Sequence, residues 1–254
     1  MRNRRIVGTE GTNKIKPAKE SGLDTSSSPS HILKKNLFVY TRHIMEPIQI
    51  GLIGVLILSV VLHEVAHGYA ANWLGDPTAR LQGRLSINPL VHIDPLMSVI
   101  VPGMLILSGS PFLFGAAKPV PYNPYNFTNQ KWGEAIVAVA GPLANVFLAL
   151  VFTVVVHLAS PLGLSTAFVG FAIQIVVLNL FLAFFNLVPI PPLDGSKILP
   201  RFLPYSLSMQ YERFRRVLEQ NSVLGFILVI FAFMYVLGGP LSALTQSVAR
   251  LLLS

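Results

Sequence analysis

The chain has 254 residues, of which 52% are hydrophobic and only 12% are charged, and its mean hydropathy is +0.61. Soluble domains carry about 25% charged residues, so this composition excludes an ordinary soluble domain and favours a polytopic membrane protein. The absence of cysteine excludes disulfides, thiolate metal ligands and a cysteine nucleophile. The net charge of +8 does not indicate nucleic-acid binding, because the basic excess has no folded, aromatic-interleaved domain to occupy.

The amino-terminal part differs in composition from the rest of the chain. Residues 1–46 hold nine Lys and Arg against four acids, and Thr25–Ser30 is almost entirely Ser, Thr and Pro. Such a stretch cannot bury enough apolar surface to fold alone. We therefore predict a flexible basic tail over residues 1–44, which the protein does not need, and a membrane-embedded domain over residues 45–254.

The first span carries the most informative motif of the sequence. Ile48–Trp73 is long enough to cross a bilayer, and inside it lies His63-Glu64-Val65-Ala66-His67. On a helix, positions i and i+4 share a face, so both imidazoles can reach one metal ion. Glu64 follows the first histidine, where it can take a proton from a water molecule. This is the zinc-hydrolase pattern H-E-x-x-H, and a chance occurrence would have to explain an unpaired glutamate buried in a span.

Further apolar runs follow, separated by proline-rich and basic stretches. The expected elements are a broken or re-entrant segment at Leu96–Phe114, an extended loop at Ala117–Phe127, spans at Glu134–Leu158 and Phe168–Val188, an interfacial segment at Ser196–Gln220, a short last span at Val223–Leu237, and an amphipathic surface helix at Leu241–Leu253. The second of these spans runs into Pro189-Ile190-Pro191-Pro192-Leu193-Asp194-Gly195, which cannot continue as regular helix. Irregular backbone at membrane depth is tolerated only where it is buried in protein or lines a cavity.

A catalytic zinc site commonly has three protein ligands, and the motif supplies two of them. The remaining candidates in the sequence are Asp194, Asp94, His92 and Glu134. Asp194 is favoured, because it stands beside a forced break in a spanning helix, where the side chain can turn inward. Taken alone, Leu193-Asp194-Gly195 would be an ordinary turn at a helix end.

Three motifs in this order resemble the site-2 protease family of intramembrane zinc metalloproteases. They are HEVAH in one span, GPLAN at residues 141–145 in the next, and NLVPIPPLDG at residues 186–195, and the resemblance covers roughly residues 45–201. It implies one Zn²⁺ per chain held by His63, His67 and Asp194, with Glu64 as general base. It also implies that Asn186 holds the substrate backbone or the developing oxyanion. The sequence resembles the short bacterial members, without a PDZ or CBS domain.

The predicted fold is an all-α polytopic membrane protein with about four to six membrane segments around a three-helix metalloprotease core, a re-entrant segment and short extended loops. The predicted function is hydrolysis of peptide bonds in or near transmembrane segments of membrane proteins. Pro189 and Pro192 are further candidates for binding the extended substrate. The alternative is a catalytically silent membrane scaffold of the same fold. The expected partners are a transmembrane protein substrate and the lipid bilayer, with no nucleic acid.

Charge predicts the orientation of the spans. If the first span ends on the cytoplasmic side, eight of the cations that follow it lie on that side, as the positive-inside rule requires. These cations are Arg80, Arg84, Lys118, Lys131, Arg201, Arg213, Arg215 and Arg216. The prediction is a multi-pass protein of the cytoplasmic membrane with the metal site toward the cytoplasmic face. It requires residues 96–114 to start and end on one side, and it leaves the basic tail on the other.

Overall fold

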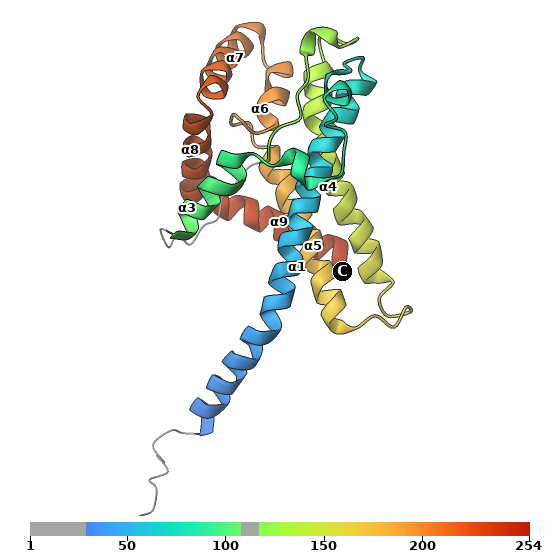
Figure 1. Ribbon diagram of the computed structural model, residues 1–254, viewed down its shortest axis with the longest axis vertical. Helices are drawn as coiled ribbons and strands as arrows, with labels where there is room; N and C mark the ends of the chain where they lie inside the picture. Colours follow the sequence, from blue (N-terminus) through green and yellow to red (C-terminus); the bar gives the residue numbers. More distant parts are fainter. Residues whose placement is uncertain (1–28, 108–116) are drawn as a thin grey trace, which may run out of the picture. The chain divides into compact units, whose positions relative to one another are not determined.

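The computed structural model describes residues 29–107 and 117–254. Within these residues the chain forms helices and turns and no strand, which confirms the predicted all-α polytopic fold (Figure 1). Four helical segments are long and apolar enough to cross a membrane. They are Gln49–Trp73, Gly133–His157, Thr166–Asn186 and Val223–Leu253.

The first of these segments belongs to helix α1 (Pro29–Trp73). The helix ends where Gly75 adopts a positive φ of 102°, a conformation that glycine accepts without steric cost. The helix begins well upstream of the predicted span, so residues 29–44 are helical where a flexible tail was predicted. Residues 1–28 of that tail lie outside the described residues. The compact unit that carries the other elements is Pro47–Ser254.

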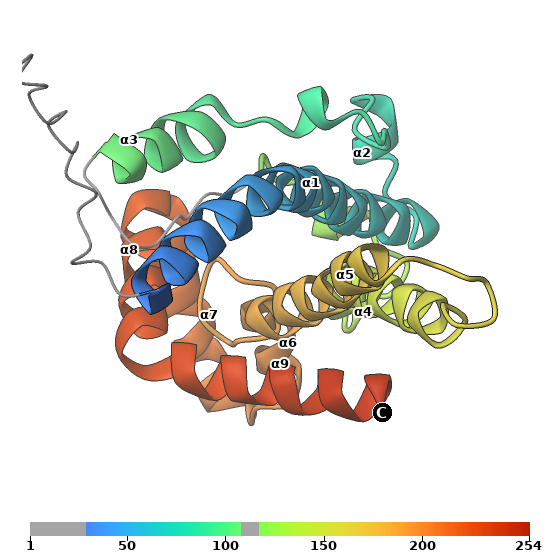
Figure 2. The same ribbon diagram turned by 90° about the horizontal axis from the view of Figure 1, so that it is seen from below.

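Helices α4 (Gly133–His157) and α5 (Thr166–Asn186) pack side by side as an antiparallel pair, and α9 (Gly238–Leu253) crosses beside α5 (Figure 2). Small residues make this close packing possible. Ala149 of α4 and Ala249 of α9 are almost fully buried against Val176 and Leu180 of α5. The predicted spans 134–158 and 168–188 are confirmed to within two residues at each end.

The segment between His92 and Lys118 begins and ends at the same place in the compact unit. It contains π-helix η2 (Pro95–Ile100) and α3 (Val101–Leu107), and residues 108–116 lie outside the described part. The backbone N–H of Lys118 donates to the carbonyl of His92 at 2.8 Å. A segment whose two ends are joined in this way cannot cross the bilayer once, so the structure favours the re-entrant arrangement.

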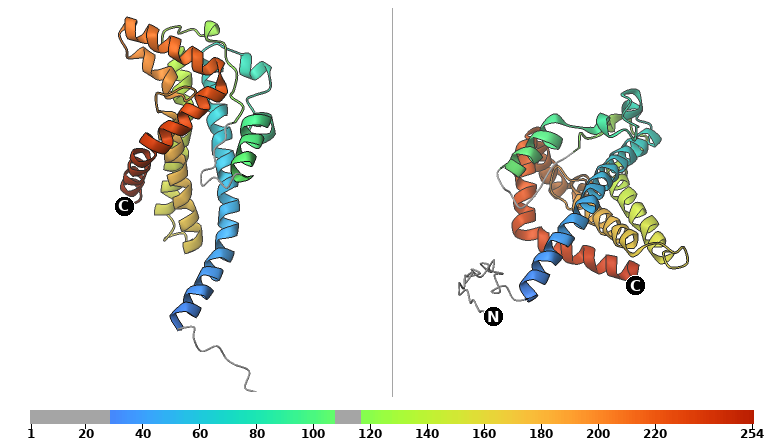
Figure 3. Two further views of the ribbon diagram at one scale, coloured as in Figure 1. Left: turned by 90° about the vertical axis from the view of Figure 1, so that its left-hand side faces the viewer. Right: turned by 60° about the horizontal axis from the view of Figure 1, so that its bottom comes forward.

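The carboxyl-terminal helices form one continuous run. It consists of α8 (Ser222–Ala232), π-helix η5 (Phe233–Leu237) and α9, and the chain turns sharply between α8 and α9 (Figure 3). π-Helical turns, glycine and proline are the usual causes of such bends, and Gly238-Gly239-Pro240 follows η5 directly. The sequence predicts an amphipathic helix at residues 241–253, and α9 has this pattern: Leu241, Thr245 and Ala249, spaced four residues apart, form a buried face, and the residues between them are exposed or half-buried.

Short helices and α7 (Tyr205–Gln220) gather where α1 ends and α4 begins, at the top of Figure 1. Glu134, in the first turn of α4, accepts from Arg215 at 2.8 Å and from Arg201 at 3.2 Å. Glu212 and Glu219 of α7 complete this ion-pair cluster. The short helices are α2 (Thr78–Leu81), η1 (Pro89–His92), η3 (Pro124–Asn126), α6 (Gly195–Ile198) and η4 (Leu199–Arg201).

Candidate metal centre

Helix α1 places both histidines of the HEVAH motif on one buried face. His63 and His67 are only 6% and 7% exposed, and their Nε2 atoms lie 3.1 Å apart. The i, i+4 spacing accounts for this arrangement, because residues four apart in a helix lie one above the other. The geometry that the sequence pattern predicted for the two imidazoles is present.

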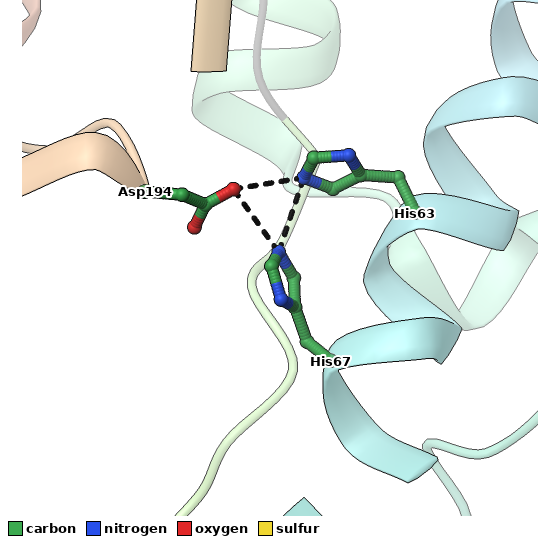
Figure 4. A group of neighbouring side chains, drawn as sticks. All are labelled: His63, His67 and Asp194. Atoms are coloured by element: carbon green, nitrogen blue, oxygen red, sulfur yellow. Dashed lines mark hydrogen bonds and ion pairs between the residues drawn. The ribbon is translucent and has the colours of Figure 1, made fainter. Parts of the chain in front are cut away.

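Asp194 comes from the turn between α5 and α6 and faces both imidazoles (Figure 4). Its Oδ2 lies 3.1 Å from His63 Nε2 and 3.2 Å from His67 Nε2. The next residue has to be glycine, because a Cβ on Gly195 would collide with the carbonyl of Leu187. Because the backbone at Gly195 packs against the carbonyl of Leu187 at the end of α5, the Asp194 carboxylate lies next to the histidines.

The hydrogen-bond partner of Nδ1 in each imidazole fixes which ring nitrogen carries the hydrogen. His63 Nδ1 lies 2.6 Å from Asn145 Oδ1, and His67 Nδ1 lies 2.7 Å from the carbonyl oxygen of Val137. Both oxygens are acceptors, so each Nδ1 carries a hydrogen and donates it. In the neutral rings the Nε2 atoms then present lone pairs toward Asp194.

Three electron-pair donors therefore converge on one buried point. One ligand atom from each of His63, His67 and Asp194 lies within 4.8 Å of the others. Two imidazole nitrogens and a carboxylate oxygen are a donor set that suits Zn²⁺, and three protein ligands are typical of a catalytic site. Hydrogen bonds from the non-ligating nitrogens to oxygen acceptors are the usual way in which metal-binding histidines are oriented. The residues present fit a zinc ion.

The Asp194 carboxyl is held in its ionised form. Burial by itself would raise its pKa, but hydrogen bonds from His63 and His67, the positive charge of a protonated His67 and the charge of Lys197 outweigh that effect. The pKa of Asp194 therefore lies well below its ordinary value. In their protonated form the imidazoles carry a hydrogen on Nε2 as well as on Nδ1, and metal binding would displace the Nε2 hydrogens. An ionised carboxylate is the form that binds a metal.

Glu64 is joined to the segment that follows the re-entrant region. Its Oε2 accepts a hydrogen bond from the backbone N–H of Val120 at 2.9 Å. Arg84 donates to the carbonyl oxygens of Lys118 and Pro119, at 2.8 and 3.3 Å, and fixes the start of this segment. Glu64, the candidate general base, is thus held by the backbone N–H of a residue that is distant in the sequence.

Helix α4 closes the other side of the centre. A Cβ added to Gly141 would lie 2.5 Å from His67 Nε2 and 2.6 Å from His63 Nε2. Pro142, which follows, has no N–H to donate to the carbonyl of Ala138 and disturbs the helix at this level. Only a glycine at residue 141 allows the α4 backbone to approach both imidazoles so closely.

The remaining predicted residues are not among these contacts. Asn186 ends α5 and donates to the carbonyl of Leu182 in its own helix at 2.9 Å. Pro189 and Pro192 are exposed in the loop between α5 and α6. The other ligand candidates have different partners: His92 donates to the Ser86 carbonyl, Asp94 caps η2, and Glu134 belongs to the ion-pair cluster.

The roles of Asn145 and of its neighbour Asn179 were not predicted from the sequence. Asn145 is the last residue of the motif GPLAN, and it accepts a hydrogen bond from His63. Two asparagines inside strongly apolar helices were the available signal, because an amide in a span needs a partner as an ionisable group does.

The chain is similar to known proteins along most of its length. Residues 162–232 match the family model described as Peptidase family M50. The chain is 34% identical over 211 residues to the Bacillus subtilis protein named "Putative zinc metalloprotease YwhC", covering 79% of this chain and 90% of that protein. It is 31% identical over 182 residues to "Putative zinc metalloprotease Rip2" of Mycolicibacterium smegmatis, covering 68% of this chain and 62% of that protein.

Similarity also extends to an archaeal protein. The chain is 48% identical over 90 residues to "Putative zinc metalloprotease MJ0611" of Methanocaldococcus jannaschii, covering 34% of this chain and 45% of that protein. No solved structure matches the chain.

Proposed function

Because the chain belongs to peptidase family M50, the site-2 protease family, we propose that it is an intramembrane zinc metalloprotease that cuts membrane proteins in or near their transmembrane segments. The observation that carries this proposal is the convergence of His63, His67 and Asp194 on one buried point beside Glu64. In this proposal the three converging residues hold one Zn²⁺ and Glu64 is the catalytic base.

The zinc, when bound, supplies a Lewis acid that lowers the pKa of a water molecule and polarises the scissile carbonyl. Glu64 takes a proton from the attacking water and returns it to the amine that leaves. The hydrogen bond from Val120 N–H to Oε2 holds the carboxylate in place and leaves its other oxygen for that proton. His63 and His67 keep their Nδ1 hydrogens throughout, because Asn145 and Val137 accept them.

Substrate binding is assigned to the break after α5. Asn186 would have to release its bond to Leu182 in order to hold a substrate backbone or the oxyanion. Pro189 and Pro192 lie exposed in the same loop, where an extended peptide can reach them. The substrate helix itself must unwind locally, since a peptide bond inside a regular helix is shielded by its own hydrogen bonds.

The orientation in the membrane follows from the gathering of cations at one end of the compact unit. Helix α7 lies at the end of the unit where α1 ends (Figure 1), and it carries Arg213, Arg215 and Arg216. Arg201, in η4, is bound to the same ion-pair cluster. Under the positive-inside rule that end faces the cytoplasm, with the metal centre toward it, in the cytoplasmic membrane. We keep residues 45–254 as the membrane-embedded protease domain and residues 1–44 as a part that catalysis does not require.

The test is cleavage of a model transmembrane substrate by purified wild type and Glu64→Gln, with zinc measured in both proteins. We expect the variant to keep its zinc and to lose at least about 100-fold in rate, the usual scale for a general base. Glu219→Gln is the matched control, because Glu219 lies in α7 with its side chain 36% exposed, and it should cleave normally. Equal cleavage by wild type and Glu64→Gln would reject Glu64 as the catalytic base, and no cleavage by a zinc-loaded wild type would favour the silent scaffold.

A further inference from the structure

Two fully buried asparagines, of which only Asn145 touches a proposed metal ligand, lie inside the compact unit. Asn145 of α4 and Asn179 of α5 both have no exposed surface. Each lies in a span whose neighbouring residues are nearly all apolar. Burying an amide in such surroundings costs free energy unless its donors and acceptor find partners. Their contacts therefore call for an explanation.

The contacts form a chain of hydrogen bonds through three helices. Asn179 Nδ2 donates to the carbonyl of Ile175 at 3.0 Å. Asn145 Nδ2 donates to Asn179 Oδ1 at 3.0 Å, and it also lies 3.4 Å from the Ser59 carbonyl of α1. Asn145 Oδ1 is left to accept from His63 Nδ1 at 2.6 Å. The chain thus runs from α5 through α4 to a proposed metal ligand on α1.

Only one assignment of donors and acceptors fits every hydrogen bond in this series. Ile175 and Ser59 contribute carbonyl oxygens, which can only accept, so both asparagines must point their NH₂ groups toward them. That assignment turns Asn145 Oδ1 toward His63. An oxygen at that place can accept only from a protonated Nδ1, which leaves the lone pair of the neutral ring on Nε2. Asn179, together with the Ser59 carbonyl, therefore orients Asn145 so that the free lone pair of His63 lies on Nε2, the nitrogen that faces Asp194.

Two buried threonines, one in α4 and one in α9, behave differently. Thr153 of α4 donates to the carbonyl of Ala149, and Thr245 of α9 donates to that of Leu241. Each bond is made four residues back within the same helix and orients nothing outside it. The asparagine pair connects helices and ends on the metal centre.

We propose that Asn179 is a positioning residue for the metal site and acts through Asn145 to hold His63 in the tautomer that binds metal through Nε2. This inference rests on the proposed function, because it takes His63 as a zinc ligand. Outer partners of metal-binding histidines commonly set metal affinity, and here that outer partner is itself fixed by a residue on a third helix.

The rival explanation is that the asparagines only join α4 to α5. Interhelical hydrogen bonds between polar side chains are a general means of association between spans. A joining role predicts lost stability and a zinc site that remains intact as long as the protein stays folded. A positioning role predicts weaker zinc binding even in variants that remain folded.

The experiment measures zinc affinity by competition with a chelator in the purified full-length protein. The variants are Asn145→Leu, Asn179→Leu and the double variant, with Thr153→Val as a matched control that removes a buried polar group from α4. We expect a loss of about 10–100-fold for Asn145→Leu, as for other outer partners. For Asn179→Leu we expect about threefold to tenfold, the scale of one interhelical bond. Thr153→Val should bind zinc as wild type does.

The double variant separates the two explanations. If Asn179 acts through Asn145, adding Asn179→Leu to Asn145→Leu should cost no further affinity, because the intermediate link is already gone. Losses that multiply in full, or an Asn179→Leu variant with wild-type affinity, would overturn the proposal. Failure of wild type itself to bind zinc would instead remove the proposed function, so the two failures are distinct.

A conservative replacement covers the case in which Asn179→Leu does not fold. A protonated aspartic acid has the shape of asparagine and keeps an oxygen that can accept from Asn145 Nδ2. A carboxyl buried in apolar surroundings stays protonated. Asn179→Asp should therefore keep most of the zinc affinity, and a loss as large as that of Asn145→Leu would contradict the relay.

Discussion

Asp76, just after α1, and Asp194, at the start of α6, are both buried carboxylates, but their surroundings differ in kind. Asp76 accepts from the N–H and hydroxyl of Thr78, the N–H of Asn123 and the amide of Asn126, at 2.6 to 3.3 Å. Asp194 faces two imidazole nitrogens whose rings carry their hydrogens on the opposite side. The protein surrounds the first carboxylate with hydrogen-bond donors of its own, and it places beside the second two imidazole nitrogens that could bind a metal ion together with it.

The ion-pair cluster on Glu134 shows a third arrangement. Arg215 is 6% exposed and lies within 4 Å of Glu134, Glu212 and Glu219. Here the positive charge is built into the sequence. The candidate metal site therefore differs from the other two in that several possible ligand atoms converge without an arginine between them. Burial of a carboxylate, or a cluster of acids, is not enough to identify a metal site. The predictions below challenge this distinction, from the largest expected effect to the smallest.

Asp194→Ala should remove one of the three converging donors and lower zinc affinity by more than about 100-fold, since even an outer partner contributes 10–100-fold. The measurement is zinc content after dialysis against a chelator. Asp94→Ala is the control, because Asp94 caps η2 by accepting from the backbone N–H groups of Leu96 and Met97. Unchanged zinc in the Asp194 variant would assign the third ligand to another residue.

Gly141→Ala should disturb the same centre from the side of α4. The added methyl would overlap both Nε2 atoms, so the imidazoles must move apart. A displacement of about 1 Å at a catalytic centre can cost 100-fold in rate, and we expect cleavage to fall on that scale. Gly170→Ala is the matched control, because a Cβ at Gly170, also in an α-helix, would meet nothing within 4 Å. Equal cleavage rates for the two variants would show that the α4 backbone does not constrain the position of the imidazoles.

Arg215→Met tests the cluster that carries its own cation. The change leaves Glu134 without its shortest ion pair, and removing one partner of a buried pair costs about 3–5 kcal/mol. We expect a loss of unfolding free energy of about 3 kcal/mol or less, because neighbouring Arg201 also contacts Glu134. Thermal unfolding in detergent measures the loss, and exposed Arg213→Met is the control. Zinc bound per folded molecule should not change in either variant; a loss of zinc would show that the two regions are coupled.

The sequence predicted what depends on the periodicity of a single helix. The HEVAH spacing placed His63 and His67 on one face, and the break at residues 189–195 indicated where Asp194 turns inward. The contacts of Gly141, Asn145 and Asn179 could not be predicted in this way, because they depend on the relative register of three helices. That register is set by packing of small residues such as Ala149 and Ala249, and no periodic pattern records it.

The smallest predicted effect concerns Asp76 and the pH dependence of stability. Burial by itself would raise the pKa of the Asp76 carboxyl, but the hydrogen bonds from Thr78, Asn126 and Asn123 outweigh it and hold the pKa below its ordinary value of about 4. A carboxyl whose pKa is lower in the folded protein contributes stability above the unfolded pKa, and this contribution is lost as the pH falls through the folded pKa.

Asp76→Asn should therefore be less stable than wild type at pH 7, and the difference in melting temperature should shrink as the pH is lowered below about 4. Asp94→Asn is the control for acid effects elsewhere in the chain. Melting temperatures between pH 3 and pH 7, in the same detergent, provide the comparison. A difference that stays constant over this range would mean that the donors around Asp76 bind the neutral side chain as well as the charged one. Asp76 would then no longer contrast with Asp194 as a carboxylate whose charge the protein itself satisfies.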